Sequence, residues 1–125
     1  MRGQISLEYL MISVVSLSLI FISLLSLMAI KDSSMKALEI LKFKSSIVSL
    51  SSSINEVCAL GNGNSQSLDL TSSLSMETTK TDHWLVRFSN GNLSLVRPAI
   101  CQVEAERNLE GLVYVKNENG IIRVR

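Results

Sequence analysis

The chain has 125 residues, a length that suits one small domain, and its formal net charge is only +1. Its Lys and Arg residues form no cluster, so the sequence lacks the basic face that binding to nucleic acid requires. The charged residues are unevenly distributed, because none lies between Tyr9 and Ile30. A near-neutral chain with one charge-free run points to contact with a membrane.

The run Tyr9–Ile30 is long enough to cross a membrane. Its 22 residues form a helix about 33 Å long at about 1.5 Å per residue, and a bilayer core is about 30 Å thick. A cleaved secretory signal peptide has an apolar region of only about 7–15 residues, and a small-residue cleavage site that Leu27–Met28–Ala29 lacks. Two interpretations remain: a plain transmembrane anchor, or a hydrophobic helix that stays after a short leader is removed.

The residues in front of the run favour the second interpretation. Arg2–Gly3–Gln4–Ile5–Ser6–Leu7–Glu8–Tyr9 resembles the class III signal peptide of archaeal pilin-like proteins, which has a short basic leader ending in Gly, then Gln, then Ser and Glu at alternate positions, then a hydrophobic helix. The Glu8–Tyr9 pair is also similar to the start of bacterial tight-adherence pilins. The resemblance covers the leader and the helix only, and implies a leader of residues 1–3 and a polymerisation helix of residues 4–30.

The resemblance also implies a route of processing and assembly. A membrane prepilin peptidase would cut between Gly3 and Gln4 on the cytoplasmic side, and a pilus assembly machinery would then join the chain to copies of itself or to related pilins. Arg2 independently favours a cytoplasmic N-terminus, because a positive charge before a first apolar helix stays inside. Before assembly, the chain is expected to span the cell membrane once, surrounded by lipid, with its C-terminal part outside.

Glu8 lies at the edge of the apolar run. A carboxylate in or near hydrocarbon costs a few kcal/mol, and such residues are functional candidates. On one interpretation, Glu8 simply lies in the headgroup region. On the pilin resemblance, it pairs with the new α-amino group of Gln4 in the apolar core of a filament, where pairing offsets much of the desolvation cost. Gln4 and Glu8 are therefore the predicted assembly residues.

The apolar helix is rich in serine, with hydroxyls at Ser13, Ser16, Ser18, Ser23 and Ser26. Small polar residues let membrane helices approach closely and bond across the contact, which favours a packing seam between neighbouring helices. The alternative is that each hydroxyl bonds back to the preceding turn of its own helix.

The helical pattern continues beyond the apolar run, through residues 31–60. Apolar residues recur there at spacings of three, four and seven, namely Ala37, Ile40, Leu41, Ile47, Val48, Ile54, Val57 and Cys58. No Pro or Gly occurs between Gly3 and Gly61, so we expect one long helix, or a helix with a soft joint near Asp32–Ser34. Gly61 is the expected stop. This second half is amphipathic, and its apolar face needs a cover.

Residues 61–125 are predicted to form an antiparallel sheet of about four to six strands. Trp84, Val86 and Phe88 alternate with polar neighbours, and Asn90–Gly91 is a two-residue hairpin signal. Further strands are expected within Ile100–Arg107 and on both sides of the turn at Asn117–Gly120. The predicted fold class is α+β, a long N-terminal transmembrane helix packed in its second half on a small antiparallel β-sheet. This arrangement resembles the general type IV pilin plan.

Two features suit an extracytoplasmic domain. Cys58 and Cys101 are far apart in sequence and form no CxxC motif, so they are either a single disulfide or two small buried apolar residues. Asn92–Leu93–Ser94 is a sequon for N-glycosylation.

No catalytic set, metal-ligand spacing or phosphate loop is found, and we expect neither enzymatic activity nor a cofactor or metal. His83 is the only histidine, and no motif places a nucleophile beside it. Glu104, Glu106 and Glu110 are interpreted as a solvated face, with calcium binding as the alternative.

The sequence therefore predicts a pilin or pilin-like subunit of an archaeal cell-surface filament that serves adhesion. The alternative is a monomeric membrane-anchored binding module outside the cytoplasm. Loss of residues 1–3 from the mature chain would separate the two.

Overall fold

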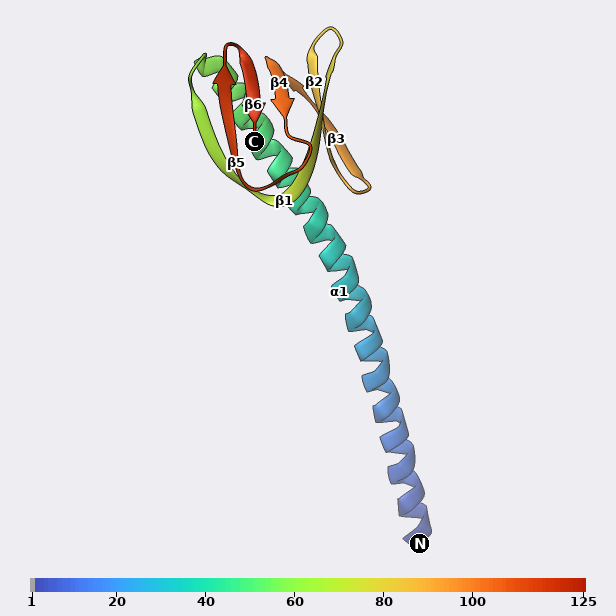
Figure 1. Ribbon diagram of the computed structural model, residues 1–125. Helices are drawn as coiled ribbons and strands as arrows, with labels where there is room; N and C mark the ends of the chain where they lie inside the picture. Colours follow the sequence, from blue (N-terminus) through green and yellow to red (C-terminus); the bar gives the residue numbers. More distant parts are fainter. Residues whose placement is uncertain (1) are drawn as a thin grey trace. The chain divides into compact units, whose positions relative to one another are not determined.

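The computed structural model describes residues 2–125, with side chains from Ser6 onward. Within these residues, one helix and six strands follow one another: α1 (Arg2–Leu60), β1 (Ser65–Lys80), β2 (Trp84–Asn90), β3 (Leu93–Ala99), β4 (Gln102–Ala105), β5 (Leu109–Glu118) and β6 (Ile121–Val124) (Figure 1). The chain divides into two compact units, an N-terminal unit that ends at Leu38 and a C-terminal unit of residues Glu39–Arg125. The fold class is α+β, as the sequence predicts.

Helix α1 is continuous through Asp32–Ser34, where a joint was one of the expectations. The reason is the absence of Pro and Gly between Gly3 and Gly61, since either residue would weaken the ladder of backbone hydrogen bonds. The helix ends where the sequence predicts. Gly61 has a φ of 86° and donates its N–H to the carbonyl oxygen of Cys58 at 3.2 Å, the left-handed ending that glycine allows without strain.

Within the C-terminal unit, α1 buries one face. The buried apolar positions are Phe43, Ile47, Leu50, Ile54 and Val57, spaced by three or four residues as one face of a helix requires. The sequence also assigned Leu41 and Val48 to the amphipathic pattern, but both are more than half exposed. Leu41 and Val48 are seven residues apart and lie on the face of α1 opposite to the buried face. A spacing of seven residues therefore indicates a shared helix face but does not show which face is buried.

The C-terminal unit holds one six-stranded sheet with the order β3-β2-β1-β5-β6-β4. The expectation of a purely antiparallel sheet is wrong for one pair, because β4 and β6 are parallel. The cause lies in β1, whose pairing with β5 is interrupted between Leu70 and Leu74. Figure 1 shows β1 turning at this point, so that its two halves run in different directions. On one side of β1 the antiparallel partners are β5 and then β6, and on the other side they are β2 and then β3, which leads directly into β4. Because the two halves of β1 run in different directions, β4 arrives beside β6 parallel to it.

The sheet curls around the C-terminal part of α1 (Figure 1). β3 and β4 are consecutive in the chain yet form opposite edges of the sheet, and only Ile100 and Cys101 join them. Since two residues span a short distance, the two edges must lie near each other. The hydroxyl of Thr78 in β1 donates a hydrogen bond of 2.9 Å to the carbonyl oxygen of Val103 in β4, which links the two sides.

The second half of β1 was not predicted as a strand. Residues Thr71–Lys80 are rich in Ser and Thr, a composition typical of loops. The strand signal is nevertheless present, because Leu70, Leu74 and Met76 are buried and the residues between them are more exposed. Ser72 is polar and stands where the alternation requires an apolar side chain, so the pattern of a strand was not recognised in the sequence.

The two hairpin turns differ from each other in type. Gly120 and Asn119 both have positive φ between the paired residues Glu118 and Ile121, which is a type I′ turn at the predicted place. In the β2–β3 hairpin, the two central residues are Gly91 and Asn92 rather than Asn90 and Gly91, because Asn90 pairs with Leu93. Gly91 has a φ of 56° and Asn92 does not have a positive φ, so this turn places Gly first, as type II′ does.

Candidate functional site

The first candidate site is the apolar part of α1 that lies in the N-terminal unit. Between Leu7 and Ile30, seventeen large apolar side chains are each at least half exposed. Among the residues that the structure describes, α1 is the one helix long and apolar enough to cross a membrane. Because burying one such side chain is worth about 1.5–3 kcal/mol, this surface gains on the order of 30 kcal/mol when lipid or protein covers it.

Glu8 lies exposed on this helix. No ion pair within the described residues includes it. The predicted cleavage site between Gly3 and Gln4 and the side chain of Gln4 lie outside the described side chains, and the leader residue Met1 lies outside the described chain. The pairing of Gln4 with Glu8 therefore stays a prediction.

Four of the five serines in the apolar run Tyr9–Ile30 bond to the backbone of their own helix. The hydroxyls of Ser13, Ser18, Ser23 and Ser26 donate to carbonyl oxygens three or four residues earlier, at 2.8–2.9 Å. These bonds satisfy the hydroxyls within the helix, as serines in apolar surroundings commonly do. Each serine still presents a small side chain, so close approach of another helix is not prevented.

Cys58 and Cys101 form a disulfide, with their Cα atoms 6.0 Å apart. It joins the end of α1 to the short connection between β3 and β4. Neither Cys58 nor Cys101 therefore has a free thiol.

A hollow of about 460 Å³ lies beside His83. Asp82 and His83 border it from the β1–β2 turn, and Asn55 borders it from α1. Trp84 is half-buried and packs against the core, with the Lys80 ammonium 5.2 Å from the centre of its ring. The register explains this contact, because Lys80 and Trp84 are paired across β1 and β2. These residues offer a cation–π contact and polar atoms, but no nucleophile beside the imidazole.

The three glutamates that the sequence analysis singled out do not form a cation site. Glu104 faces Arg123 at 3.7 Å, and Glu104, Glu106 and Glu110 are all exposed. Among the described residues, no group of three or more His, Cys, Asp or Glu could hold a metal ion.

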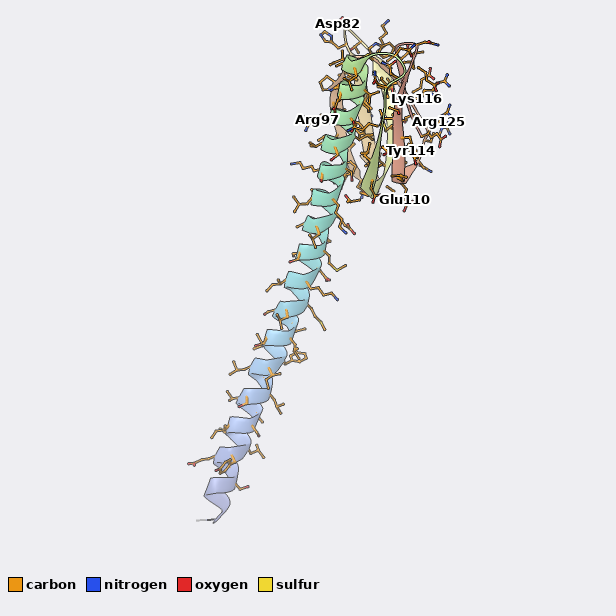
Figure 2. All side chains as sticks on the ribbon, turned by 90° about the vertical axis from the view of Figure 1, so that its left-hand side faces the viewer. Asp82, Arg97, Glu110, Tyr114, Lys116 and Arg125 are labelled. Carbon is orange, nitrogen blue, oxygen red and sulfur yellow. A yellow bond between two sulfur atoms is a disulfide. The ribbon has the colours of Figure 1, made fainter. Side chains whose placement is uncertain are left out.

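A charge network on the outer face of the sheet was missed by the sequence analysis. Glu118 bonds to Lys116 at 3.1 Å and to Arg123 at 3.1 Å, and Lys116 with Tyr114 points away from α1 (Figure 2). The hydrogen bond from Lys116, together with the positive charges of Lys116 and Arg123, lowers the pKa of Glu118 below its ordinary value. The feature that could have revealed this network is the register of the β5–β6 hairpin, because it places Lys116 directly opposite Arg123.

Asn92, the sequon asparagine, is exposed in the β2–β3 turn and borders a second, polar hollow. The molecule thus offers an exposed apolar helix, one disulfide and the hollows beside His83 and Asn92 as candidate functional features. No known protein family, curated protein or solved structure matches the chain.

Proposed function

We propose that this chain is a pilin-like subunit of an archaeal cell-surface filament that serves adhesion. It is processed between Gly3 and Gln4, is assembled through its N-terminal hydrophobic helix, and acts without enzymatic activity. The observation that carries the proposal is the exposure, by at least half, of every large apolar side chain between Leu7 and Ile30, directly behind a leader-like sequence. A helix that exposes apolar side chains on all sides requires a membrane or other helices around it.

Two environments can cover this helix in turn. Lipid covers it before assembly, and the single span Tyr9–Ile30 then holds the chain in the cell membrane. In a filament, the same residues pack against the helices of neighbouring copies. Glu8 is the residue that distinguishes the two environments, because a carboxylate can reach the headgroups from one end of a span but needs a cationic partner inside a protein core. The α-amino group that cleavage creates on Gln4 would be that partner.

A monomeric, membrane-anchored binding module is the second candidate. The serine hydroxyls favour it, since Ser13, Ser18, Ser23 and Ser26 bond within their own helix and do not require a neighbouring one. A monomer uses the apolar helix only as an anchor and leaves Glu8 at the membrane surface.

Intact mass and fractionation test the proposal. The chain is isolated from the surface material that shearing releases from native cells, and its mass should correspond to a chain that begins at Gln4. A full-length mass, or recovery only with membranes, would favour the anchored monomer. Glu8→Gln should leave processing unchanged and remove the chain from the sheared fraction. Tyr9→Phe is the matched control, because it alters the neighbouring exposed side chain without changing charge, and it should behave as the unchanged protein.

A further inference from the structure

The sequon Asn92–Leu93–Ser94 occupies an accessible part of the C-terminal unit. Asn92 is the second central residue of the β2–β3 turn, and Ser94 lies two residues later in β3; both are exposed. β3 forms an edge of the sheet, so one side of its backbone is not paired with another strand. An enzyme can therefore reach the amide of Asn92 and the hydroxyl of Ser94 without unfolding the domain. No other asparagine in the chain is followed two residues later by Ser or Thr.

Asn92 borders a hollow of about 550 Å³, which is within the range of volumes that hold small ligands. Most of the residues that line it are polar. Glu39 and Lys42 come from α1, and the others come from β1 and the β2–β3 turn: Thr71, Ser72, Ser73, Asn90, Gly91 and Leu93. A hydrogen bond of 2.9 Å from the side-chain amide of Asn90 to the hydroxyl of Ser72 joins the turn to β1. The hollow thus has a wall that is fixed by the fold.

Two charged groups border this hollow with bonding capacity to spare. Within the part of the chain that the structure describes, neither Glu39 nor Lys42 belongs to an ion pair. A carboxylate accepts hydrogen bonds and an ammonium donates them, and bonds to charged groups are stronger than bonds between neutral groups. A ligand with many hydroxyls, each able to donate and accept, matches both groups at once.

From the coincidence of these features we infer that Asn92 carries an N-linked glycan whose first sugar rings lie in the hollow bordered by Glu39 and Lys42. The donor is a lipid-diphosphate-linked oligosaccharide. The Nδ2 atom of Asn92 forms a bond to the anomeric carbon of the sugar as the bond from that carbon to the diphosphate oxygen breaks. The electron pair leaves with the lipid diphosphate, and the amide proton passes to a base of the transferring enzyme. This inference rests on the proposed function, in which the C-terminal unit lies outside the cell membrane.

The modification is tested on the chain isolated from its native host. Mass spectrometry of the peptide that contains Asn92 should show an added mass built of sugar units. Ser94→Ala destroys the sequon and should remove this mass, whereas Ser94→Thr preserves the sequon and should retain it. Asn108→Gln, an exposed asparagine outside any sequon, should leave it unchanged. An unmodified Asn92 peptide in the native chain would overturn the inference.

The position of the sugar is tested by thermal unfolding of the full-length chain in detergent. Glu39→Gln with Lys42→Met should lower Tm by about 4 °C in the glycosylated chain and leave Tm unchanged in the Ser94→Ala background. Equal shifts in the two backgrounds would show that the glycan does not use the hollow.

The outcomes separate this inference from the proposed function. An unmodified Asn92 in a chain that begins at Gln4 and lies in sheared filaments overturns the glycan alone. A modified Asn92 in a chain that keeps its leader overturns the processing step and leaves the outward orientation and the glycan in place.

Discussion

Helix α1 passes through two units of the molecule with opposite degrees of burial. In the N-terminal unit its leucines and isoleucines from Leu7 onward are at least half exposed, whereas in the C-terminal unit Ile47 and Leu50 are 0% exposed. Both segments consist of similar apolar residues, so composition does not explain the difference. The sheet covers the second segment, and nothing else in the described chain covers the first. The partner of the first segment must therefore come from outside the chain, which is why its exposure carries the functional argument.

The largest expected effect comes from an identical substitution on the two faces of α1. Leu50→Ala should destabilise the C-terminal unit by about 2–5 kcal/mol, because it removes buried methyl groups and leaves a cavity. Leu41→Ala, at a position that is 61% exposed, should change stability by less than about 0.5 kcal/mol. Denaturant unfolding of the full-length chain in detergent measures both. A similar loss in the two variants would mean that the buried face of α1 is wrongly identified.

The disulfide is expected to have the next largest effect. Cys58 and Cys101 close a loop with a sequence separation of 43 residues, and a disulfide across a loop of that length stabilises by up to about 4 kcal/mol through the unfolded chain. Cys58→Ser with Cys101→Ser should lower Tm of the C-terminal unit. A reductant should lower Tm of the unchanged protein to a similar value and have no effect on the variant. Unequal values in these two states would show that the serine hydroxyls, rather than the loss of the bond, account for the change.

Much of the fold could be predicted from the sequence, because local signals determined it. The end of α1 follows from Gly61, and the β5–β6 turn follows from Asn119–Gly120, where both residues have positive φ. The parallel pairing of β4 with β6 could not be predicted. It depends on the turn that β1 makes between Leu70 and Leu74, and residues 71–73 within that turn include no Gly or Pro that would mark it in the sequence.

The candidate site was predictable to a different degree in each unit. The apolar run and Glu8 can be found from the sequence alone, because a carboxylate stands directly before a long segment without charged residues. Finding them needs no knowledge of the fold. The polar hollow beside Asn92 was not visible, since Glu39 on α1, Ser72 on β1 and Asn92 in the turn are far apart in sequence and meet only when the sheet curls around the helix. The sequon marked the position of the site, while its walls required the structure.

A charge introduced into the apolar segment would sharpen the contrast between the units. Leu19→Lys places an ammonium near the middle of the span, and should make membrane insertion less favourable by about 2.5–3.5 kcal/mol. Leu60→Lys is the matched control, because Leu60 is 62% exposed and Leu19 is 60% exposed, but Leu60 lies at the far end of α1. The share of chain retained in membranes after alkaline extraction should fall for the first variant only. A comparable fall for the second would contradict the assignment of the span.

The smallest expected effect concerns the outer face of the sheet. The pKa of Glu118 is lowered, first by its hydrogen bond from Lys116 and then by the charges of Lys116 and Arg123. A carboxyl whose pKa is lower in the folded state contributes stability above the ordinary glutamate value of 4.5, and this contribution is lost as the pH falls through the lowered value. Between pH 7 and pH 3, Tm of the unchanged protein should therefore fall slightly more than Tm of Glu118→Gln.

This pH effect should be small, because exposed ion pairs contribute little and are screened by salt. Raising the ionic strength to about 1 M should remove the difference between the unchanged protein and Glu118→Gln. Glu110→Gln is the control, since Glu110 is exposed and belongs to no ion pair within the described residues, and it should follow the unchanged protein at every pH. A difference that persists in high salt would mean that Glu118 stabilises the β5–β6 hairpin through the geometry of its hydrogen bond rather than through its charge.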